Sequence, residues 1–273
     1  MAGLPAAATG HSAARTGTHS TGNPSVTFAD HFSSVSAAYA AFRPRYPDEL
    51  FAFLAREAPA RNVAWDVGTG SGQAAISLAR FFTRVIATDA SSTQIDHAEP
   101  HPSVTYRVAP AEDSGVADRS VDLVTVAQAV HWFDRGRFWS EVRRTLRPRG
   151  VIAVWTYGLF EITPEIDEVV RRFYSGIVGP FWPPERRLTE ERYRTIDFPF
   201  QEIAAPEYVI EQQVTLDDVA GYIRTWSATR AFTKQHHQDP VDELVKSVAV
   251  AWRTPQPARL ARWPVSMRVG RVS

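Results

Sequence analysis

Short apolar runs alternate with stretches of helical periodicity through the middle of the chain. Strands buried on both faces are predicted at 63–67, 83–88, 104–108, 121–127 and 151–155. Between the first two runs, Ala75, Leu78 and Phe82 recur at the spacing of one helix face. Strands that alternate with helices predict a parallel sheet with helices on both faces, and therefore the α/β fold class.

The pattern changes in the second half of the chain. The stretch 156–205 breaks the alternation, because it is dense in aromatic residues and interrupted by prolines. Two further strands are predicted at 207–214 and 262–272, with helical patterns at 216–229 and 240–252 between them.

A glycine-rich turn joins the first predicted strand to its helix. The sequence there is Asp66-Val67-Gly68-Thr69-Gly70-Ser71-Gly72. Glycine lets a backbone turn tightly and approach a ligand closely. The first amides of the following helix are unpaired donors at its positive end, which suits an anionic group. The turn therefore predicts a site for a nucleotide-type cofactor.

Three details indicate which cofactor this is. The glycines run G-x-G-x-G rather than G-x-G-x-x-G, and Asp66 before them would repel a pyrophosphate but pair with an α-amino group. Asp89 follows 23 residues later (89 − 66), at the end of the second strand, where a carboxylate can bind both ribose hydroxyls. The helix does not begin with Lys-Ser/Thr, which argues against a P-loop. An amine, a ribose and no phosphate suggest S-adenosylmethionine.

Five segments, in order, resemble the class I S-adenosylmethionine-dependent methyltransferases of the small-molecule "type 11" group, and are most similar to the subgroup with the trans-aconitate methyltransferases. They are 66–73, 88–91, 111–112, 122–133 and 146–150. The resemblance covers roughly residues 28–157. Arg149 departs from it, because the family usually has a glycine there, and we expect little effect on the chemistry.

The resemblance implies a doubly wound, seven-stranded, mostly parallel sheet of Rossmann-like methyltransferase type. The strands at 207–214 and 262–272 would be the antiparallel pair that completes it. One domain at 28–273 is expected, with an amino-terminal lid segment at 28–46. The insertions at 156–205 and 215–255 would form a helical and aromatic cap over the substrate, although the aromatic residues could equally form only the core of that cap.

The cofactor-binding residues follow from the turn and the resemblance together. Asp66, Gly68 and Gly70 are assigned to the methionine part of the cofactor and Asp89 to its ribose. The resemblance adds residues of the turn and residues near the adenine, and Gln128 is expected in the crevice beyond the fourth strand. For Glu112 and Gln128 the alternative is a solvated loop residue. The residues added in this way are Thr69, Gln73, Ala90, Ala111 and Glu112.

Three residues are candidates for the methyl-transfer chemistry itself. His131, after the fourth strand, is a possible general base for a hydroxyl or amine, but we favour a role in orienting its loop through hydrogen bonds. Tyr39 and Arg43 resemble an amino-terminal lid motif. The fork of Arg43 suits a carboxylate, of the cofactor or of an acid substrate, and a plain surface arginine is the alternative.

Composition narrows the function classes. Acidic and basic residues are equal in number at 30 each, so the chain has no electrostatic footprint for nucleic acid. No cysteine is present. His97 and His101 are four residues apart, but Pro100 between them disfavours a shared helix face, so we expect no metal. No apolar run is long enough to span a membrane. Residues 1–27 predict a disordered tail, and the protein is expected to be cytoplasmic, as a monomer or a homodimer.

The sequence thus predicts methyl transfer to a small molecule, with a carboxylate or hydroxyl oxygen as the favoured acceptor. One alternative is a protein that binds S-adenosylmethionine without catalysis. The other is a nicotinamide-dependent oxidoreductase on a related sheet, which the glycine spacing and Asp66 disfavour.

Overall fold

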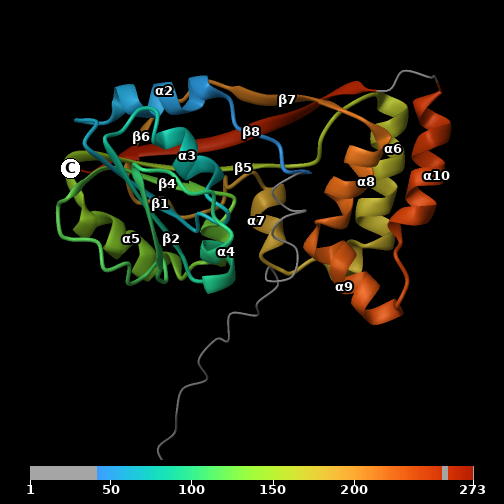
Figure 1. Cartoon of the computed structure of the whole chain (residues 1–273), viewed down its shortest axis with the longest axis horizontal. Coiled ribbons are helices and arrows are strands. Elements are labelled where there is room, and N and C mark those ends of the chain that lie inside the picture. Colours follow the sequence, from blue (N-terminus) through green and yellow to red (C-terminus); the bar gives the residue numbers. More distant parts are fainter. Residues whose placement is uncertain (1–41, 254–257, 273) are drawn as a thin grey trace, which may run out of the picture. The chain divides into compact units, whose positions relative to one another are not determined.

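The computed structural model describes residues 42–253 and 258–272, which belong to one compact unit (Figure 1). The expected tail at 1–27, Tyr39 and most of the segment 28–46 lie outside the described residues. The α/β class is confirmed, because strands and helices alternate along the chain from residue 63 to residue 157.

Five parallel strands form the first part of the sheet, in the order β3-β2-β1-β4-β5, and β8 is antiparallel to β5. The strand order therefore reverses between β1 and β4, which opens a crevice at their carboxyl ends. The strands are β1 (Val63–Val67), β2 (Arg84–Asp89), β3 (Val104–Val108), β4 (Val121–Ala127), β5 (Leu146–Tyr157), β6 (Gln201–Ile203), β7 (Tyr208–Val214) and β8 (Arg259–Arg271).

The eight described strands occupy seven positions in the sheet. Val265 of β8 pairs with β5 on one side and with Tyr208 of β7 on the other, and β6 pairs with β8 further along that second side. Ile203 of β6 lies opposite Val269 of β8, and Tyr208 of β7 lies opposite Val265 of β8. The register along β8 therefore changes by one residue from β6 to β7. Therefore β6 and β7 form one interrupted edge strand, and the predicted seven-stranded, mostly parallel sheet is confirmed.

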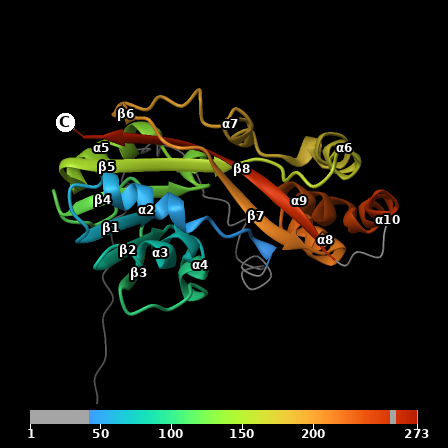
Figure 2. The same ribbon diagram turned by 90° about the horizontal axis from the view of Figure 1, so that it is seen from above.

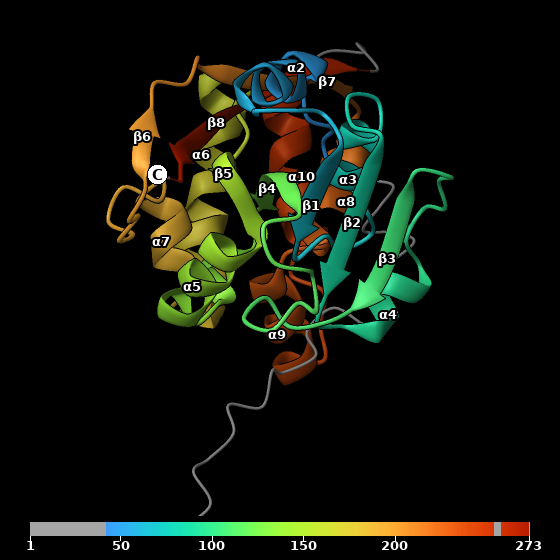
Figure 3. The same ribbon diagram turned by 90° about the vertical axis from the view of Figure 1, so that its left-hand side faces the viewer.

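Helices cover the two faces of the sheet, because successive residues of each strand point to opposite sides. On one face Trp65 packs with Phe138 and Val142 of α5, and on the other Ala64 packs with helices α2 and α3. Figure 3 shows α5 and α2 on different sides of the strands. The helices of this part are α2 (Asp48–Glu57), α3 (Gln73–Leu78), α4 (Ser92–Asp96), a 3-10 turn η1 (Val130–Trp132) and α5 (Arg135–Thr145).

A second group of helices packs around one end of β7 and β8 (Figures 1 and 2). It has a hydrophobic core of its own, in which Phe160, Tyr222 and Trp263 are buried. Its elements are α6 (Pro164–Arg172), a π-helix η2 (Phe173–Ile177), a 3-10 turn η3 (Gly179–Phe181), α8 (Leu216–Arg224), α9 (Ser227–His236) and α10 (Val241–Trp252). Helix α7 (Arg186–Glu190) is separate from this core, because its Leu188 packs on the core of the sheet. The cap boundaries at 156–205 and 215–255 remain predictions, although the helical elements fall within them.

Strand β5 differs from the sequence prediction in two local details. Strand β5 begins at Leu146 instead of 151, because Val121 pairs with Leu146 and Leu123 with Val151, so the residues between bulge out of the ladder. Arg149 lies in this bulge with a φ of +64°, the left-handed conformation that favours glycine. The departure at Arg149 therefore has a conformational cost.

Candidate functional site

The glycine-rich turn lies at the carboxyl end of β1, next to the ends of β2 and β4. Gly68, Gly70 and Gly72 all have positive φ, at +64°, +56° and +90°. A Cβ added to Gly68 would lie 2.6 Å from Cβ of Ala129, so no side chain fits there. A Cβ at Gly70 would meet only Oε1 of Gln94, at 3.9 Å. A Cβ at Gly72 would overlap the hydroxyl of Tyr106. The turn thus needs glycine at Gly68 and Gly72 for space, and at all three positions for backbone conformation.

Asp66 is buried beneath this turn. Its side chain is 1% exposed, and its two oxygens accept hydrogen bonds from Oγ1 of Thr125 at 2.7 Å and Oγ1 of Thr69 at 2.6 Å. Burial raises the pKa of Asp66 to about 6, against the lowering effect of these hydrogen bonds. The carboxylate is therefore held in a fixed position inside the site. Its pairing with the amino group of the cofactor remains a prediction.

Asp89 joins the end of β2 to the turn. One carboxylate oxygen accepts from the backbone N–H of Gly70 and the other from that of Ser91, both at 2.9 Å. Burial raises the pKa of Asp89 above its ordinary value. Each oxygen has a further lone pair, so the half-buried carboxylate can also accept from the two hydroxyls of a ribose.

The other predicted cofactor residues differ in their partners. Gln128, with a φ of +59°, donates to the carbonyl of Tyr157 at 3.2 Å and accepts from Thr156 at 2.8 Å, so it is held against the end of β5. Glu112 accepts from the N–H of Asp134 at 2.8 Å, just before α5. Gln128 is therefore fixed at the end of β5, whereas the hydrogen bond of Glu112 is exposed; the roles of both residues in binding the cofactor remain predictions. Ala111 is buried, Thr69 is bonded to Asp66, Gln73 is half-buried at the start of α3, and Ala90 is exposed.

Gln94 is a polar residue at the site that the sequence analysis missed. Its side chain is 5% exposed, and its Oε1 has no hydrogen-bond partner within the described part of the chain. This oxygen faces Gly70 and would lie 3.9 Å from a Cβ added to that glycine. A buried acceptor without a partner costs free energy unless a ligand supplies the donor. In the sequence, only the position of Gln94 in the first helix after Asp89 could have indicated that it lies near the cofactor site.

These features fit S-adenosylmethionine better than a nucleotide with phosphates. Asp66 and Asp89 bring two carboxylates to the turn, which favour a cation and hydroxyl groups and repel phosphate. Gln94 adds an unpartnered acceptor oxygen beside the open space above Gly70. These hydrogen-bond acceptors at the turn are thus suited to an amine and to the hydroxyls of a ribose.

His131 lies in the 3-10 turn after β4 and is 7% exposed. Its Nδ1 forms a hydrogen bond with the hydroxyl of Tyr193 at 2.8 Å. Burial, together with the charges of Arg186 and Arg135, lowers the pKa of His131 to about 3. The imidazole is therefore neutral at physiological pH and ties the end of β4 to the segment after α7.

Arg43 lies near the carboxyl end of β5. Its Nη1 donates to the hydroxyl of Tyr157 at 3.3 Å, and its guanidinium lies 5.5 Å from the centre of the Tyr222 ring. Tyr46, from the same segment, packs edge-on against Trp155 with ring centres 5.5 Å apart. The structure thus brings Arg43 and Gln128 together through Tyr157, whereas Tyr39 lies outside the described residues.

Within 42–253 and 258–272, no group of three or more metal-ligating side chains could hold a metal ion. The helices of the same residues include none that is long and apolar enough to cross a membrane.

Comparisons with known proteins agree on the family. A family model described as a methyltransferase domain matches residues 65–154. A Dictyostelium discoideum protein named as a methyltransferase is 36% identical over 231 residues, which cover 83% of this chain and 88% of that protein. A probable S-adenosylmethionine-dependent methyltransferase of Saccharomyces cerevisiae is 33% identical over 245 residues, 75% of this chain and 83% of that protein.

A solved structure supports the same assignment. An Anaeromyxobacter dehalogenans protein described as a type II methyltransferase has 49% sequence identity and a TM-score of 0.79, covering 84% of this chain and 97% of that chain. The part of this chain that it covers is longer than the segment 65–154 that the family model matches. The chain therefore belongs to the class I S-adenosylmethionine-dependent methyltransferases.

Proposed function

We propose that this methyltransferase acts on a small molecule and methylates an oxygen atom, with a carboxylate as the leading acceptor and a hydroxyl as the second. The bound S-adenosylmethionine supplies an electrophilic methyl group. Asp89 would bind the ribose of the cofactor, and Asp66 would face its amino group. The turn at Gly68 and Gly70 would leave space for the methionine part of the cofactor. These residue roles are proposals that rest on the geometry described above.

The observation that carries the choice of a carboxylate is the state of His131. This histidine is the candidate general base, yet it is buried, bonded at Nδ1 to Tyr193, and has a pKa lowered to about 3. So weak a base takes a proton poorly from a hydroxyl or an ammonium group. A carboxylate is already ionised at neutral pH and needs no proton removed. His131 is then a positioning residue for the loop after β4.

Arg43 supports the same acceptor class. Its guanidinium is positioned by the hydroxyl of Tyr157 and the ring of Tyr222, close to the carboxyl ends of the strands. A planar guanidinium can hold a carboxylate through two parallel hydrogen bonds. The aromatic rings nearby exclude water, which favours a reaction in which two opposite charges disappear.

Several finer assignments belong to the same proposal. Similarity to the trans-aconitate methyltransferases is proposed from the sequence segments alone, since the relatives reported above are not named for an acceptor. We also propose a cytoplasmic monomer or homodimer without a nucleic-acid partner. The family membership disfavours the nicotinamide alternative. A non-catalytic protein that binds the cofactor is the remaining one.

A test distinguishes a carboxylate from the other acceptors. The protein is incubated with S-adenosylmethionine carrying a tritiated methyl group and a panel of small carboxylic acids, phenols and amines. A methyl ester releases volatile tritiated methanol when the product is treated with base, whereas ethers and methylamines do not. We expect base-labile transfer to at least one acid. Base-stable transfer only would contradict the proposed acceptor, and cofactor binding without any transfer would favour the non-catalytic alternative.

Arg43 variants make the test specific to the residue. Arg43→Ala should raise the KM for the acid at least tenfold, since it removes the partner of the acceptor carboxylate. Arg43→Lys keeps the charge but loses the fork, so an intermediate KM is expected. Kinetics equal to wild type in both variants would support the surface-arginine alternative.

A further inference from the structure

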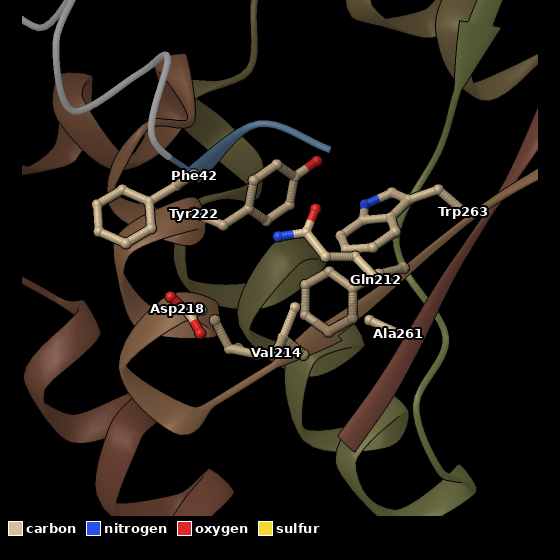
Figure 4. A pocket seen from close by; sticks show the side chains of 9 residues that line it. Phe42, Gln212, Val214, Asp218, Tyr222, Ala261 and Trp263 are labelled. Atoms are coloured by element: carbon tan, nitrogen blue, oxygen red, sulfur yellow. The ribbon is translucent and has the colours of Figure 1, made fainter. Parts of the chain in front are cut away.

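The pocket drawn in Figure 4 lies between β7, β8 and α8, and Tyr222 forms part of its wall. It has room for about one water molecule, so it does not hold the body of an acceptor. The charged groups that recognise an acceptor therefore lie outside this pocket. One of them, Arg43, lies over the ring of Tyr222. Another, Arg186 in α7, has no role in the proposed function so far.

Arg186 is the first residue of α7, and two aromatic side chains hold it. Its guanidinium lies 4.7 Å from the ring centre of Trp182 and 5.6 Å from that of Tyr174. Its Nε also donates a hydrogen bond to the hydroxyl of Tyr174 at 2.9 Å. Tyr174 belongs to the π-helix η2, and π-turns are frequent at functional sites. A guanidinium that is stacked on rings and bonded in this way keeps a fixed direction.

The positive charge of Arg186 has no counter-ion in the part of the chain that the structure describes. The side chain is half-buried and forms no ion pair with a carboxylate there. Its two terminal nitrogens have no hydrogen-bond partner among the same residues and keep surface that is open to solvent. Glu190 accepts from the hydroxyl of Tyr174 at 2.6 Å, so its carboxylate is joined to the guanidinium only through the tyrosine. A half-buried charge of this kind favours an anion beside it.

This charge lies beside the cofactor turn. Helix α7 packs against η1, which carries His131. Burial is the main cause of the low pKa of His131, and the charges of Arg186 and Arg135 add to it, so both guanidiniums lie near the imidazole. The residue before η1 is Ala129, which lies against Gly68 of the turn. An anion attracted to Arg186 is therefore drawn to the end of β4, next to the cofactor.

Arg135 adds a second positive charge of the same kind. It is the first residue of α5 and half-buried, and it has neither an ion pair nor a side-chain hydrogen bond within the described ranges. Two carboxylates belong to the same region, those of Glu112 and Asp134. Each of them accepts from a backbone N–H group, and neither pairs with Arg135. The charge around His131 therefore stays positive.

We propose that Arg186, together with Arg135, determines the charge of the acceptor that the enzyme takes. The inference rests on the proposed function and makes Arg186 a specificity-determining residue for it. An anionic acceptor is attracted to both guanidiniums, whereas a neutral molecule of the same shape is not. An ammonium group at the end of β4 meets two positive charges and, in His131, a base too weak to remove its proton.

The selectivity between an acid and its amide measures this effect. Benzoate, cinnamate and hexanoate are compared with their primary amides, which have nearly the same shape but no charge. Their dissociation constants are measured by calorimetric titration of the protein saturated with S-adenosylhomocysteine. Wild type should bind at least one acid more tightly than its amide, and Arg186→Gln should lower that ratio about tenfold. General damage to the site weakens acid and amide alike and leaves the ratio unchanged.

Further variants separate the charge from the side chain that carries it. Arg186→Lys keeps the charge and loses the stacked fork, so the ratio should stay within about threefold of wild type. Arg135→Gln should lower the ratio in the same direction as Arg186→Gln. Arg187→Gln is the matched control, because Arg187 is the next residue of α7 but is exposed and paired with Glu191. Its loss should leave the ratio unchanged.

The outcomes distinguish the two proposals. A wild type that prefers an acid, with the same ratio in Arg186→Gln, overturns the role of Arg186 and leaves the proposed function intact. A loss of selectivity that Arg186→Lys does not restore, or that Arg187→Gln reproduces, also overturns it, because the charge at this position is then not the cause. Binding of S-adenosylhomocysteine without preferential binding of any acid overturns the acceptor class and, with it, the role of Arg186.

Discussion

Ionisation of Asp66 inside the fold has a cost that can be measured. Its carboxylate is 1% exposed, and burial raises its pKa from 3.8 to about 6 although Thr69 and Thr125 hydrogen-bond to it. An acid with a higher pKa in the folded than in the unfolded chain stabilises the fold fully only below the lower value. That contribution is lost as the pH rises through about 6.

The size of the loss follows from the two pKa values. One pH unit between them corresponds to about 1.4 kcal/mol, so ionised Asp66 lowers the free energy of unfolding by about 3 kcal/mol above pH 6. Asp66→Asn keeps the size of the side chain and removes the ionisable group. The variant changes the hydrogen bonds of Thr69 and Thr125 by the same amount at every pH, so only the pH-dependent part of the difference reports on the charge.

Urea unfolding at pH 4 and pH 8 provides the measurement. The unfolded carboxyl is already more than half ionised at pH 4, so about 0.6 kcal/mol of the effect is lost there. The free energy of unfolding of Asp66→Asn minus that of wild type should therefore become more favourable to the variant by about 2.4 kcal/mol between pH 4 and pH 8. A difference that is equal at the two pH values, within about 0.5 kcal/mol, would refute the buried, ionised carboxylate. The site would then tolerate the charge at no cost, against the electrostatic account of the turn.

Three further variants test single contacts. Gln94→Met removes the unpartnered oxygen facing Gly70 and should weaken S-adenosylmethionine binding about fivefold in calorimetric titration; unchanged affinity would exclude Gln94 from the site. The free energy of unfolding in urea should be about 1 kcal/mol higher for Arg149→Gly than for Arg149→Ala, because only glycine relieves the strain of the left-handed backbone. Equal free energies of unfolding would contradict this. Tyr193→Phe should lose about 1–2 kcal/mol of stability through His131 yet bind cofactor normally, whereas lost binding would place Tyr193 in the cofactor site.

Periodicity predicted most of the sheet because its strands are buried on both faces and appear as apolar runs. The observed β1 matches the predicted 63–67, and β7 begins one residue after the predicted 207. Strand β6 was missed because Gln201-Glu202-Ile203 is short and half-exposed, and pairing with β8 rather than composition makes it a strand. The positive φ of Arg149 was missed for a similar reason, since it depends on the bulge in β5.

The cofactor was predictable where backbone geometry restricts residue type. The three glycines of the turn, with Asp66 and Asp89 near the ends of two strands, indicated S-adenosylmethionine from the sequence alone, and the roles of single residues in binding it remain predictions. Gln94 could not be identified, because a missing hydrogen-bond partner is a property of the packed structure. The neutral state of His131 likewise depends on its burial and on Arg186, which is distant in sequence.

The central claim is that methyl transfer reaches a carboxylate without the removal of a proton. The most direct measurement is kcat at saturating S-adenosylmethionine and the best acid of the panel, between pH 6.5 and pH 8.5. Because the acceptor is already ionised and the pKa of His131 is about 3, the account predicts a kcat that varies less than about twofold. A kcat that rises about tenfold per pH unit would show that a proton leaves the acceptor, and would contradict it.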